Sequence, residues 1–459
     1  MQWTIPEISD VDPETGGPRR PPILLSDDSA WLLLALGALA AVVGLGLYLA
    51  LLATHSYHAV LDGFDFKVYL EGGSLALHDP AALYTWHLAG RPGIQFTYTP
   101  FAALTFSPLT AMQWHRTVDI LTVLSLIALA GSVWIAFREC GWRGLARAGG
   151  TLAVTGVAIW FQPTQKALAL GQIELVMMGA IVWDLCQPSR RRWKGAVTGV
   201  AAGIKLVPLL YVLYLILTKR YRQAAVAGGA FAATVAIGFA VLPADSVHFW
   251  LDGYFFNASR TGFVGANVNQ SLRSILTRLD GSVAGAAPIW LVAALIAVVL
   301  GLATAVLLDR AGQTFAGLMT CALTALLVSP ISWDHHWVWM APGLVVLIDA
   351  AVRHRRWRWL FGSAAAGVVV AFLAWPQFWK SPIHWLGGGL FTYAPGTYFP
   401  YGDNPKYIEY HWYGIELILG NLYVLAGCAL LLLAAATAYW LVRHQRPVPK
   451  AGTAVETPG

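Results

Sequence analysis

Apolar stretches long enough to cross a bilayer recur along most of the chain. The first runs from about residue 31 to 52, and the last ends near Leu441. A membrane-spanning helix needs roughly 20 consecutive apolar residues, and these stretches approach or reach that length. Charged residues lie mainly in the connections between them. The pattern predicts an all-α, polytopic integral membrane protein.

Two segments do not fit a simple spanning helix. Residues 99–112 are short and contain Pro100 and Pro108, and residues 196–217 are interrupted at Pro208. Proline removes a backbone hydrogen bond and kinks a helix. A membrane tolerates the freed backbone groups only where protein or a cavity covers them. We therefore expect each segment to be a broken or re-entrant helix.

The composition supports lipid as the surrounding solvent. Of the 459 residues, 57% are hydrophobic and 12% are charged, whereas soluble domains carry about 25% charged residues. We expect one membrane domain over residues 30–443, between polar cytoplasmic tails at 1–29 and 444–459. The first thirty residues lack the basic start of a signal peptide, so the first apolar stretch is expected to be an uncleaved span.

The distribution of Lys and Arg predicts an orientation, because positive loops translocate poorly. Few cations occur in the connections at about 55–98, 243–287, 329–337 and 376–412, which we assign to the outer face. Both termini then lie in the cytoplasm, and the number of crossings is even, about 10 to 12. The segments assigned to the cytoplasm are 19–20, 138–147, 190–194, 219–222, Arg310, 353–358 and 443–450.

Charge and cysteine usage argue against a nucleic-acid-binding protein and against a disulfide-stabilised protein. The net charge is +6, but the basic residues are dispersed among short loops, so no nucleic-acid partner is expected. The four cysteines lie far apart without CxxC spacing, which predicts buried free thiols in place of a disulfide framework. These cysteines are Cys140, Cys186, Cys321 and Cys428.

Two carboxylates follow the first span. Asp62 and Asp65 are three residues apart in the first outer connection, and a helix there would place them on one face with Tyr69. A solvated turn at the membrane surface explains this pattern. A catalytic base at the lipid boundary explains it as well.

Polar side chains also occur in the other outer connections. Asn269, Gln270 and Arg273 offer directional donors suited to sugar hydroxyls and phosphate oxygens, although a helix cap is an adequate alternative. Adjacent His335 and His336 point about 100° apart on a helix, and no HxxxH or CxxC partner is nearby. We expect no metal site there, with one histidine facing a cavity and the other facing the interface.

One lysine lies inside a predicted span. Lys205 follows the cytoplasmic Lys194 by eleven residues, which places it roughly 16 Å into the helix. An ionised lysine at that depth costs about 2.5–3.5 kcal/mol, so it should face a partner or a polar cavity. Glu174 is the candidate partner. A purely structural ion pair explains the two residues about as well as substrate binding does.

Several of these residues together resemble the GT87 family of GT-C glycosyltransferases, multi-span enzymes that use polyprenyl-phosphate sugars. The resemblance covers nearly the whole membrane region, and the segment at 329–336 is its most specific part. Most family members carry Asn near the position of Glu174, which is a departure here. The matching pieces are Phe64-Asp65 with Tyr69, 98–101, Gly171-Gln172, 205–208, 269–272 and 329–336.

The resemblance implies a GT-C fold with short outer juxtamembrane helices, and an inverting α-1,2-mannosyltransferase that extends phosphatidylinositol mannosides. Its donor would be polyprenyl-phosphate-mannose, with no further cofactor, in a bacterial plasma membrane with the active site facing the periplasm. Asp65 would be the catalytic base, with Asp62 as the fallback. The implied donor- and acceptor-binding residues are His335, His336, Arg273, Lys205, Asn269, Gln270, Tyr69 and Trp333.

Three other functions stay open at this point. The same fold and base would serve an arabinosyltransferase that uses decaprenyl-phosphate-arabinose. A non-enzymatic transporter of lipid-linked sugar is favoured if Asp65 is only structural. A structural membrane subunit is the third, although the polar groups at the outer edge argue against it.

Overall fold

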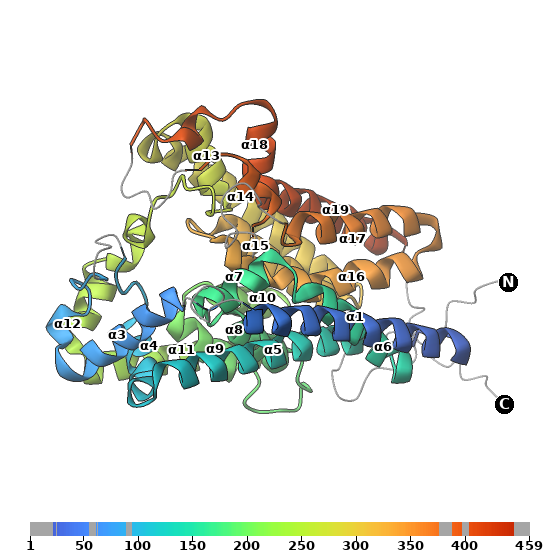
Figure 1. Ribbon diagram of the computed structural model, residues 1–459, viewed down its shortest axis with the longest axis horizontal. Helices are drawn as coiled ribbons and strands as arrows, with labels where there is room; N and C mark the ends of the chain where they lie inside the picture. Colours follow the sequence, from blue (N-terminus) through green and yellow to red (C-terminus); the bar gives the residue numbers. More distant parts are fainter. Residues whose placement is uncertain are drawn as a thin grey trace, which may run out of the picture.

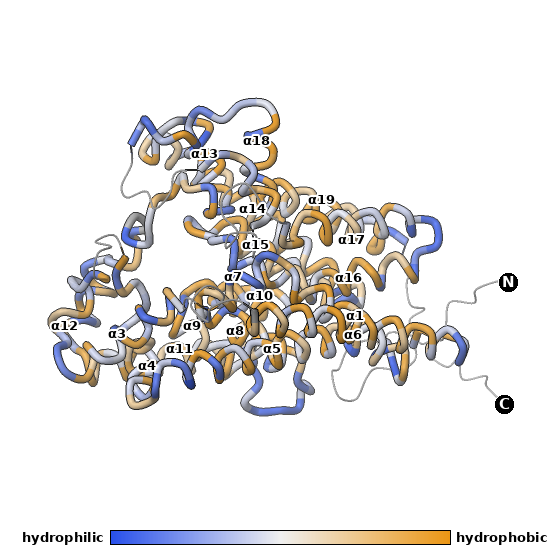
Figure 2. Tube along the Cα trace, in the orientation of Figure 1, coloured by the Kyte–Doolittle hydropathy of each residue, from blue (hydrophilic) through white to orange (hydrophobic). Residues whose placement is uncertain are grey.

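The computed structural model describes residues 22–23, 25–54, 61, 63–88, 94–375, 388–396 and 404–444. Within these ranges the chain is helical and has no strand, only three isolated β-bridges. Long apolar helices form the body of the molecule, and the hydrophilic positions lie in the connections and in the polar interior (Figure 2). The predicted all-α membrane protein is confirmed.

Among the described residues, six helices are long and apolar enough to span a bilayer. The bent pair α7 (Gln162–Leu170) and α8 (Glu174–Leu185), with a 114° angle, adds a seventh. This is fewer than the 10 to 12 crossings expected. Breaks divide other apolar stretches, and α6 (Gly144–Ala158), α15 (Thr314–Val328) and α17 (Arg358–Phe372) have only 15 residues each. The six spans are α1 (Asp27–Thr54), α5 (Trp114–Glu139), α11 (Tyr221–Val241), α14 (Val283–Arg310), η6 with α16 (Asp334–Arg353) and α19 (Leu422–His444).

Both proline-containing segments are broken, as expected. The first forms α4 (Pro100–Phe106) and a 3-10 turn, η2 (Ser107–Ala111). The second forms α9 (Ala196–Ile204) and α10 (Leu209–Leu217), and Lys205 lies in the gap between them. Proline cannot supply the N–H that would continue either helix.

Glycines allow α1 to pack closely along α6 (Figure 1). Gly37 meets Gly149, and Gly44 meets Gly156, seven residues further along each helix. A Cβ at any of these four positions would meet backbone of the facing helix. Small residues of this kind let transmembrane helices approach one another.

Gly44→Leu is expected to separate α1 from α6 and to destabilise the protein by about 1–3 kcal/mol, because the backbone of Gly156 leaves no room for a side chain. Gly46→Leu is the matched control, since nothing lies within 4 Å of a Cβ built there. Thermal unfolding of both variants in detergent measures the effect. Equal melting temperatures would contradict this packing.

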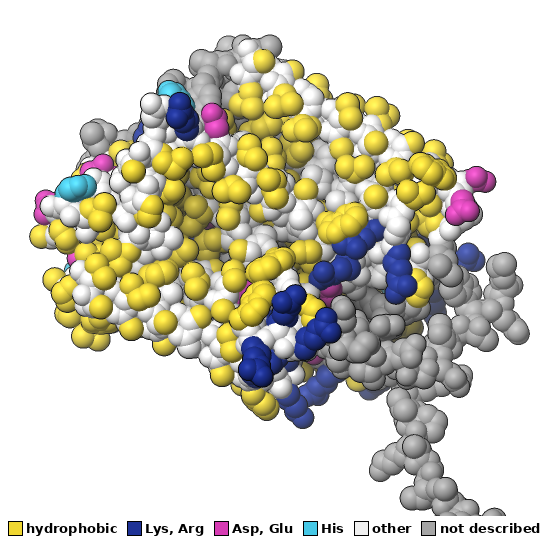
Figure 3. All heavy atoms as spheres, turned by 90° about the horizontal axis from the view of Figure 1, so that it is seen from below, with side chains coloured by type: hydrophobic (Ala, Val, Ile, Leu, Met, Phe, Trp, Pro, Cys, Tyr) yellow, Lys and Arg dark blue, Asp and Glu magenta, His cyan; other side chains and the backbone are white. Residues whose placement is uncertain are grey.

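The basic loops lie together at one end of the molecule. Polar contacts join helix ends there. Trp142 donates a hydrogen bond to Asp349 near the end of α16 (3.0 Å), and Arg220, just before α11, forms an ion pair with Asp309 near the end of α14 (2.6 Å). Lys and Arg side chains gather on one side, next to surfaces covered by hydrophobic side chains (Figure 3). The elements α3 (Phe64–His78), α12 (Pro243–Ser246), α13 (Leu272–Asp280) and α18 (Gly414–Gly420) lie away from the start of α1 (Figure 1).

Candidate active site

Asp65 lies in the first turn of α3, after Gly63, which adopts a left-handed conformation (φ 57°). Gln172 donates a hydrogen bond from Nε2 to Asp65 Oδ2. The hydroxyl of Tyr69 donates to Gln172 Oε1 and lies 2.9 Å from that of Tyr98. Asp65 and Tyr69 therefore share one face, as expected. Asp62 lies outside the described residues.

The bend between α7 and α8 brings Gln172 to Asp65. Gly171 ends α7 in a left-handed conformation (φ 65°), which a residue with a side chain rarely adopts. A Cβ at Gly171 would also lie only 2.8 Å from the Cβ of Phe66 on α3. Glycine is therefore required for the bend and for the close approach of α3.

Glu174 and Lys205 form the ion pair that the sequence predicts. Glu174 is the first residue of α8, and Lys205 reaches its Oε1 from the gap between α9 and α10. Lys205 Nζ lies 5.2 Å from the ring centroid of Tyr98 and interacts electrostatically with Asp65. The pair explains how Lys205 is accommodated between spanning helices.

The two histidines also reach this region. His336 Nε2 lies 3.3 Å from Glu174 Oε1, and the two imidazole rings are 4.8 Å apart at 89°. His335 is buried and His336 is only partly exposed. The His335 ring lies beside Asp334 and the His336 ring beside Glu174, so the expectation that one of them faces the interface is not confirmed. We call Asp65, Gln172, Glu174, Lys205, His335 and His336 the polar cluster.

Several atoms of the polar cluster have no hydrogen-bond partner within the described ranges. They are Oε2 of Glu174 and both ring nitrogens of His335. The Nδ1 atom of His335 lies 3.4 Å from Asp334, whose carboxylate accepts a 2.5 Å hydrogen bond from Gln162. Unsatisfied buried groups of this kind are rare in proteins. A polar ligand could use them.

The polar cluster includes a set of possible metal ligands. One donor atom each from Glu174, His335 and His336 lie within 4.8 Å of one another. The ammonium group of Lys205 is already bonded to Glu174 Oε1, and a second cation there would compete with it. One carboxylate oxygen of Glu174 is therefore already engaged by an ammonium group in the structure.

Asn269 and Gln270 serve as framework in the structure. The side chain of Asn269 accepts from the amide of Ser332 (2.9 Å) and donates to Val264 O (2.8 Å). Gln270 donates to Gly420 O (2.8 Å) and accepts from Tyr423 N (3.2 Å). Both amides are fully buried. The bonds of Asn269 hold the loop before α13 against Ser332, and those of Gln270 hold it against the end of α18 and the start of α19.

The remaining two candidate site residues are Trp333 and Arg273. Trp333 pairs with Asn269 through a β-bridge, and its ring lies against Gly262. Arg273 does not join the polar cluster through any contact within the described residues. Its guanidinium carbon lies 4.8 Å from the ring centroid of Trp290 on α14.

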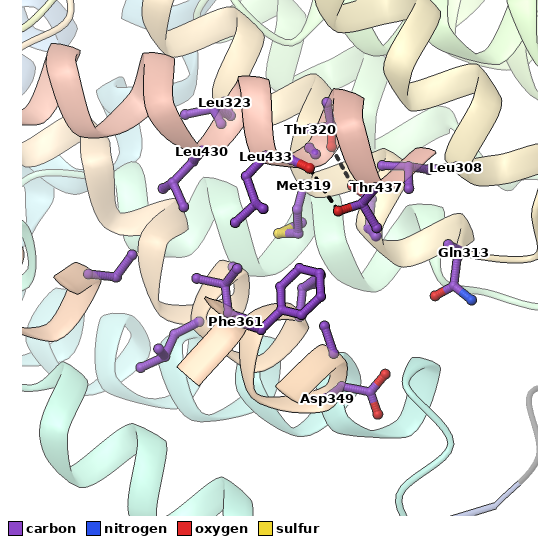
Figure 4. A pocket seen from close by; sticks show the side chains of 18 of the residues that line it. Leu308, Gln313, Met319, Thr320, Leu323, Asp349, Phe361, Leu430, Leu433 and Thr437 are labelled. Atoms are coloured by element: carbon purple, nitrogen blue, oxygen red, sulfur yellow. Dashed lines mark hydrogen bonds between the residues drawn. The ribbon is translucent and has the colours of Figure 1, made fainter. Parts of the chain in front are cut away.

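A pocket of about 110 Å³ lies elsewhere, between α14, α15, α16, α17 and α19. Its lining is mostly aliphatic, with Asp349 and Gln313 near one end, and Phe361 projects into it (Figure 4). No residue of the polar cluster lines it. This pocket is therefore not the candidate active site.

Comparison with known proteins places the chain in a family. The model of glycosyltransferase family 87 matches residues 96–330, about half of the chain. The chain belongs to glycosyltransferase family 87. The match confirms the resemblance, so the chain is a membrane glycosyltransferase. The matched region contains Gln172, Glu174 and Lys205, and folding brings Asp65, His335 and His336 to them from outside it.

Curated relatives of this family 87 chain come from mycobacteria. A polyprenol-phosphate-mannose-dependent alpha-(1-2)-phosphatidylinositol pentamannoside mannosyltransferase of Mycobacterium tuberculosis is 33% identical over 70% of this chain and 76% of its own length. A protein of the same name from Mycolicibacterium smegmatis is 32% identical over 70% and 79%. A phosphatidylinositol mannoside mannosyltransferase of that organism is 32% identical over 70% and 77%. No solved structure matches the chain.

Proposed function

We propose that this family 87 enzyme transfers mannose from polyprenyl-phosphate-mannose to the 2-hydroxyl of a mannose on a phosphatidylinositol mannoside. The observation that carries the proposal is the polar cluster, in which Asp65, Lys205 and His336 converge through Gln172 and Glu174. The relatives' names supply the donor and acceptor classes. The cluster supplies the Asp65 carboxylate as a base and nitrogen donors for an anion.

Asp65 acts as the base in this mechanism. An α-linked product from a β-linked donor requires inversion, so the acceptor oxygen attacks the anomeric carbon opposite the departing phosphate, and a single base suffices. Asp65 takes the proton of the acceptor hydroxyl as the new C–O bond forms. Gln172 donates a hydrogen bond to Oδ2 of Asp65, and Tyr69 donates one to Gln172. These bonds fix the carboxylate, and Oδ1 of Asp65 is left for the acceptor hydroxyl.

Lys205 and the histidines stabilise the departing lipid phosphate. The phosphate gains charge as the glycosidic bond breaks, and preorganised donors in a dry site lower the energy of that state. The ammonium of Lys205 and one ring N–H each of His336 and His335 provide such donors. The lipid-phosphate sugar is itself the activated donor, so the proposed reaction includes no metal ion or other cofactor.

The proposed location is the bacterial plasma membrane, with the polar cluster facing the periplasm. The cluster lies at the ends of helices whose opposite ends carry the basic loops. In α5, for example, Trp114 packs against Phe66 of α3, whereas Arg138 lies in the last turn. The positive-inside rule assigns the basic ends to the cytoplasm.

Purified protein in lipid nanodiscs tests the reaction directly. We expect mannose transfer from polyprenyl-phosphate-mannose to phosphatidylinositol mannosides, an α-1,2 linkage by product analysis, and undiminished activity in EDTA. Decaprenyl-phosphate-arabinose is the matched alternative donor. Turnover with arabinose alone would refute the sugar assignment, and lipid-linked sugar transport in vesicles without transfer would identify a transporter.

A further inference from the structure

A cation and an aromatic ring form a second polar site at the outer end of α14. The guanidinium of Arg273, on α13, stacks on Trp290, in the first part of α14. Nε of Arg273 and Nε1 of Trp290 are both buried donors, and neither has an acceptor in the described part of the chain. Two unsatisfied donors side by side call for a ligand that carries acceptor oxygens.

The neighbouring arginines Arg260 and Arg278 also leave Nε without a partner over the described ranges, but each donates hydrogen bonds through its terminal NH groups. Arg278 donates to Ala266 O (2.9 Å) and Asn269 O (3.0 Å), and Arg260 donates to Thr97 O (2.9 Å). Glu409 also interacts electrostatically with Arg278. Arg273 has no hydrogen bond or carboxylate partner among the described residues, and burial lowers the pKa of its guanidinium. An anion bound there would therefore meet no competing carboxylate among the described residues.

The position of the pair points to a lipid as the source of that anion. Next to Trp290, the side chains of Ile289, Leu291 and Val292 are each more than half exposed, on a helix that spans the membrane. Tryptophan at such a place marks the level of the lipid headgroups. A molecule with an anionic headgroup and hydrocarbon chains would satisfy both Arg273 and this apolar face.

We propose that Arg273 and Trp290 bind the phosphodiester of the phosphatidylinositol lipid that carries the acceptor mannose, with its acyl chains along α14. The inference rests on the proposed function. Guanidinium groups bind phosphate oxygens through two parallel hydrogen bonds, and the indole N–H adds a third donor. The loop before α13 pairs with residues 332–333 just before the histidines, so the same loop leads from the polar cluster to Arg273.

Steady-state kinetics in phosphatidylcholine nanodiscs test the proposal. Arg273→Gln should raise the KM for the phosphatidylinositol mannoside relative to that for an alkyl mannoside, which lacks phosphate, by about tenfold to a hundredfold. Arg273→Lys should give an intermediate ratio, because an ammonium cannot bind two oxygens in the same planar geometry. Arg116→Gln, which replaces an exposed arginine near the start of α5, is the matched control. A rise in the donor KM, or an unchanged acceptor ratio, would overturn the proposal.

A binding measurement separates this proposal from the proposed function. Native mass spectrometry should show that the wild type retains phosphatidylinositol in preference to phosphatidylcholine and that Arg273→Gln loses this preference. Equal retention of both lipids by the wild type would overturn the site. Preferential retention that depends on Arg273, in a protein that transfers no mannose, would uphold the site and refute the mannosyltransferase assignment.

Discussion

Asp65→Asn is expected to lower kcat by about a hundredfold to ten-thousandfold, the usual contribution of a general base. The amide has nearly the same shape as the carboxylate and can still bond to Gln172, but it cannot take the proton of the acceptor hydroxyl. Donor binding and the melting temperature should therefore change little. Initial rates of mannose transfer at saturating donor and acceptor measure the effect.

Glu71→Gln is the matched control for Asp65→Asn. Glu71 is a partly exposed carboxylate six residues further along α3, which turns it away from the face that carries Asp65. Its replacement should leave kcat within about twofold of the wild type, as is usual for surface substitutions. If Asp65→Asn retained most of the activity, Asp65 would be a structural residue and the transporter interpretation would gain support.

The sequence correctly predicted the contacts that follow from helical periodicity and from the burial of a charge. Asp65 and Tyr69 are four residues apart on one helix, so their shared face follows from helical geometry. The burial of Lys205 follows from its position in an apolar stretch, and a buried charge requires a partner, which is Glu174. The proline breaks are likewise local consequences of single residues.

Contacts that depend on tertiary approach could not be read from the sequence. Gln172 reaches Asp65 only because Gly171 allows a sharp bend, and neither Gln172 nor Tyr98 was a candidate site residue. The Gly-Gln pair between two apolar stretches was the available signal. Asn269 has amide chemistry that suits a sugar, but the fold uses that amide to join two loops. Residue type alone cannot distinguish these roles.

Broken helices supply most of the polar cluster. Gln172 and Glu174 come from the bend between α7 and α8, Lys205 from the gap between α9 and α10, and His336 from the 3-10 turn before α16. Exposed helix ends are unfavourable in lipid and occur where protein or a polar cavity covers them. The breaks that shorten these helices therefore also bring polar side chains to a common site.

A double-mutant cycle on Lys205 and Glu174 should separate a structural ion pair from a substrate-binding one. Lys205→Met and Glu174→Gln each leave one mostly buried charge without its partner, so each should destabilise the protein by about 3–5 kcal/mol. The double variant has neither charge and should recover most of that stability, because a neutral pair of similar volume replaces a buried ion pair at little cost. Thermal unfolding in detergent gives the stability comparison.

Transfer activity decides between the two roles of Lys205. If the ammonium stabilises the departing phosphate, the double variant should stay about a hundredfold to a thousandfold below the wild type in kcat despite its recovered stability. If the pair only holds α8 against the gap between α9 and α10, activity should return together with stability. The charge would then act on the fold alone, and the phosphate would depend on the unsatisfied nitrogens of His335 and on His336.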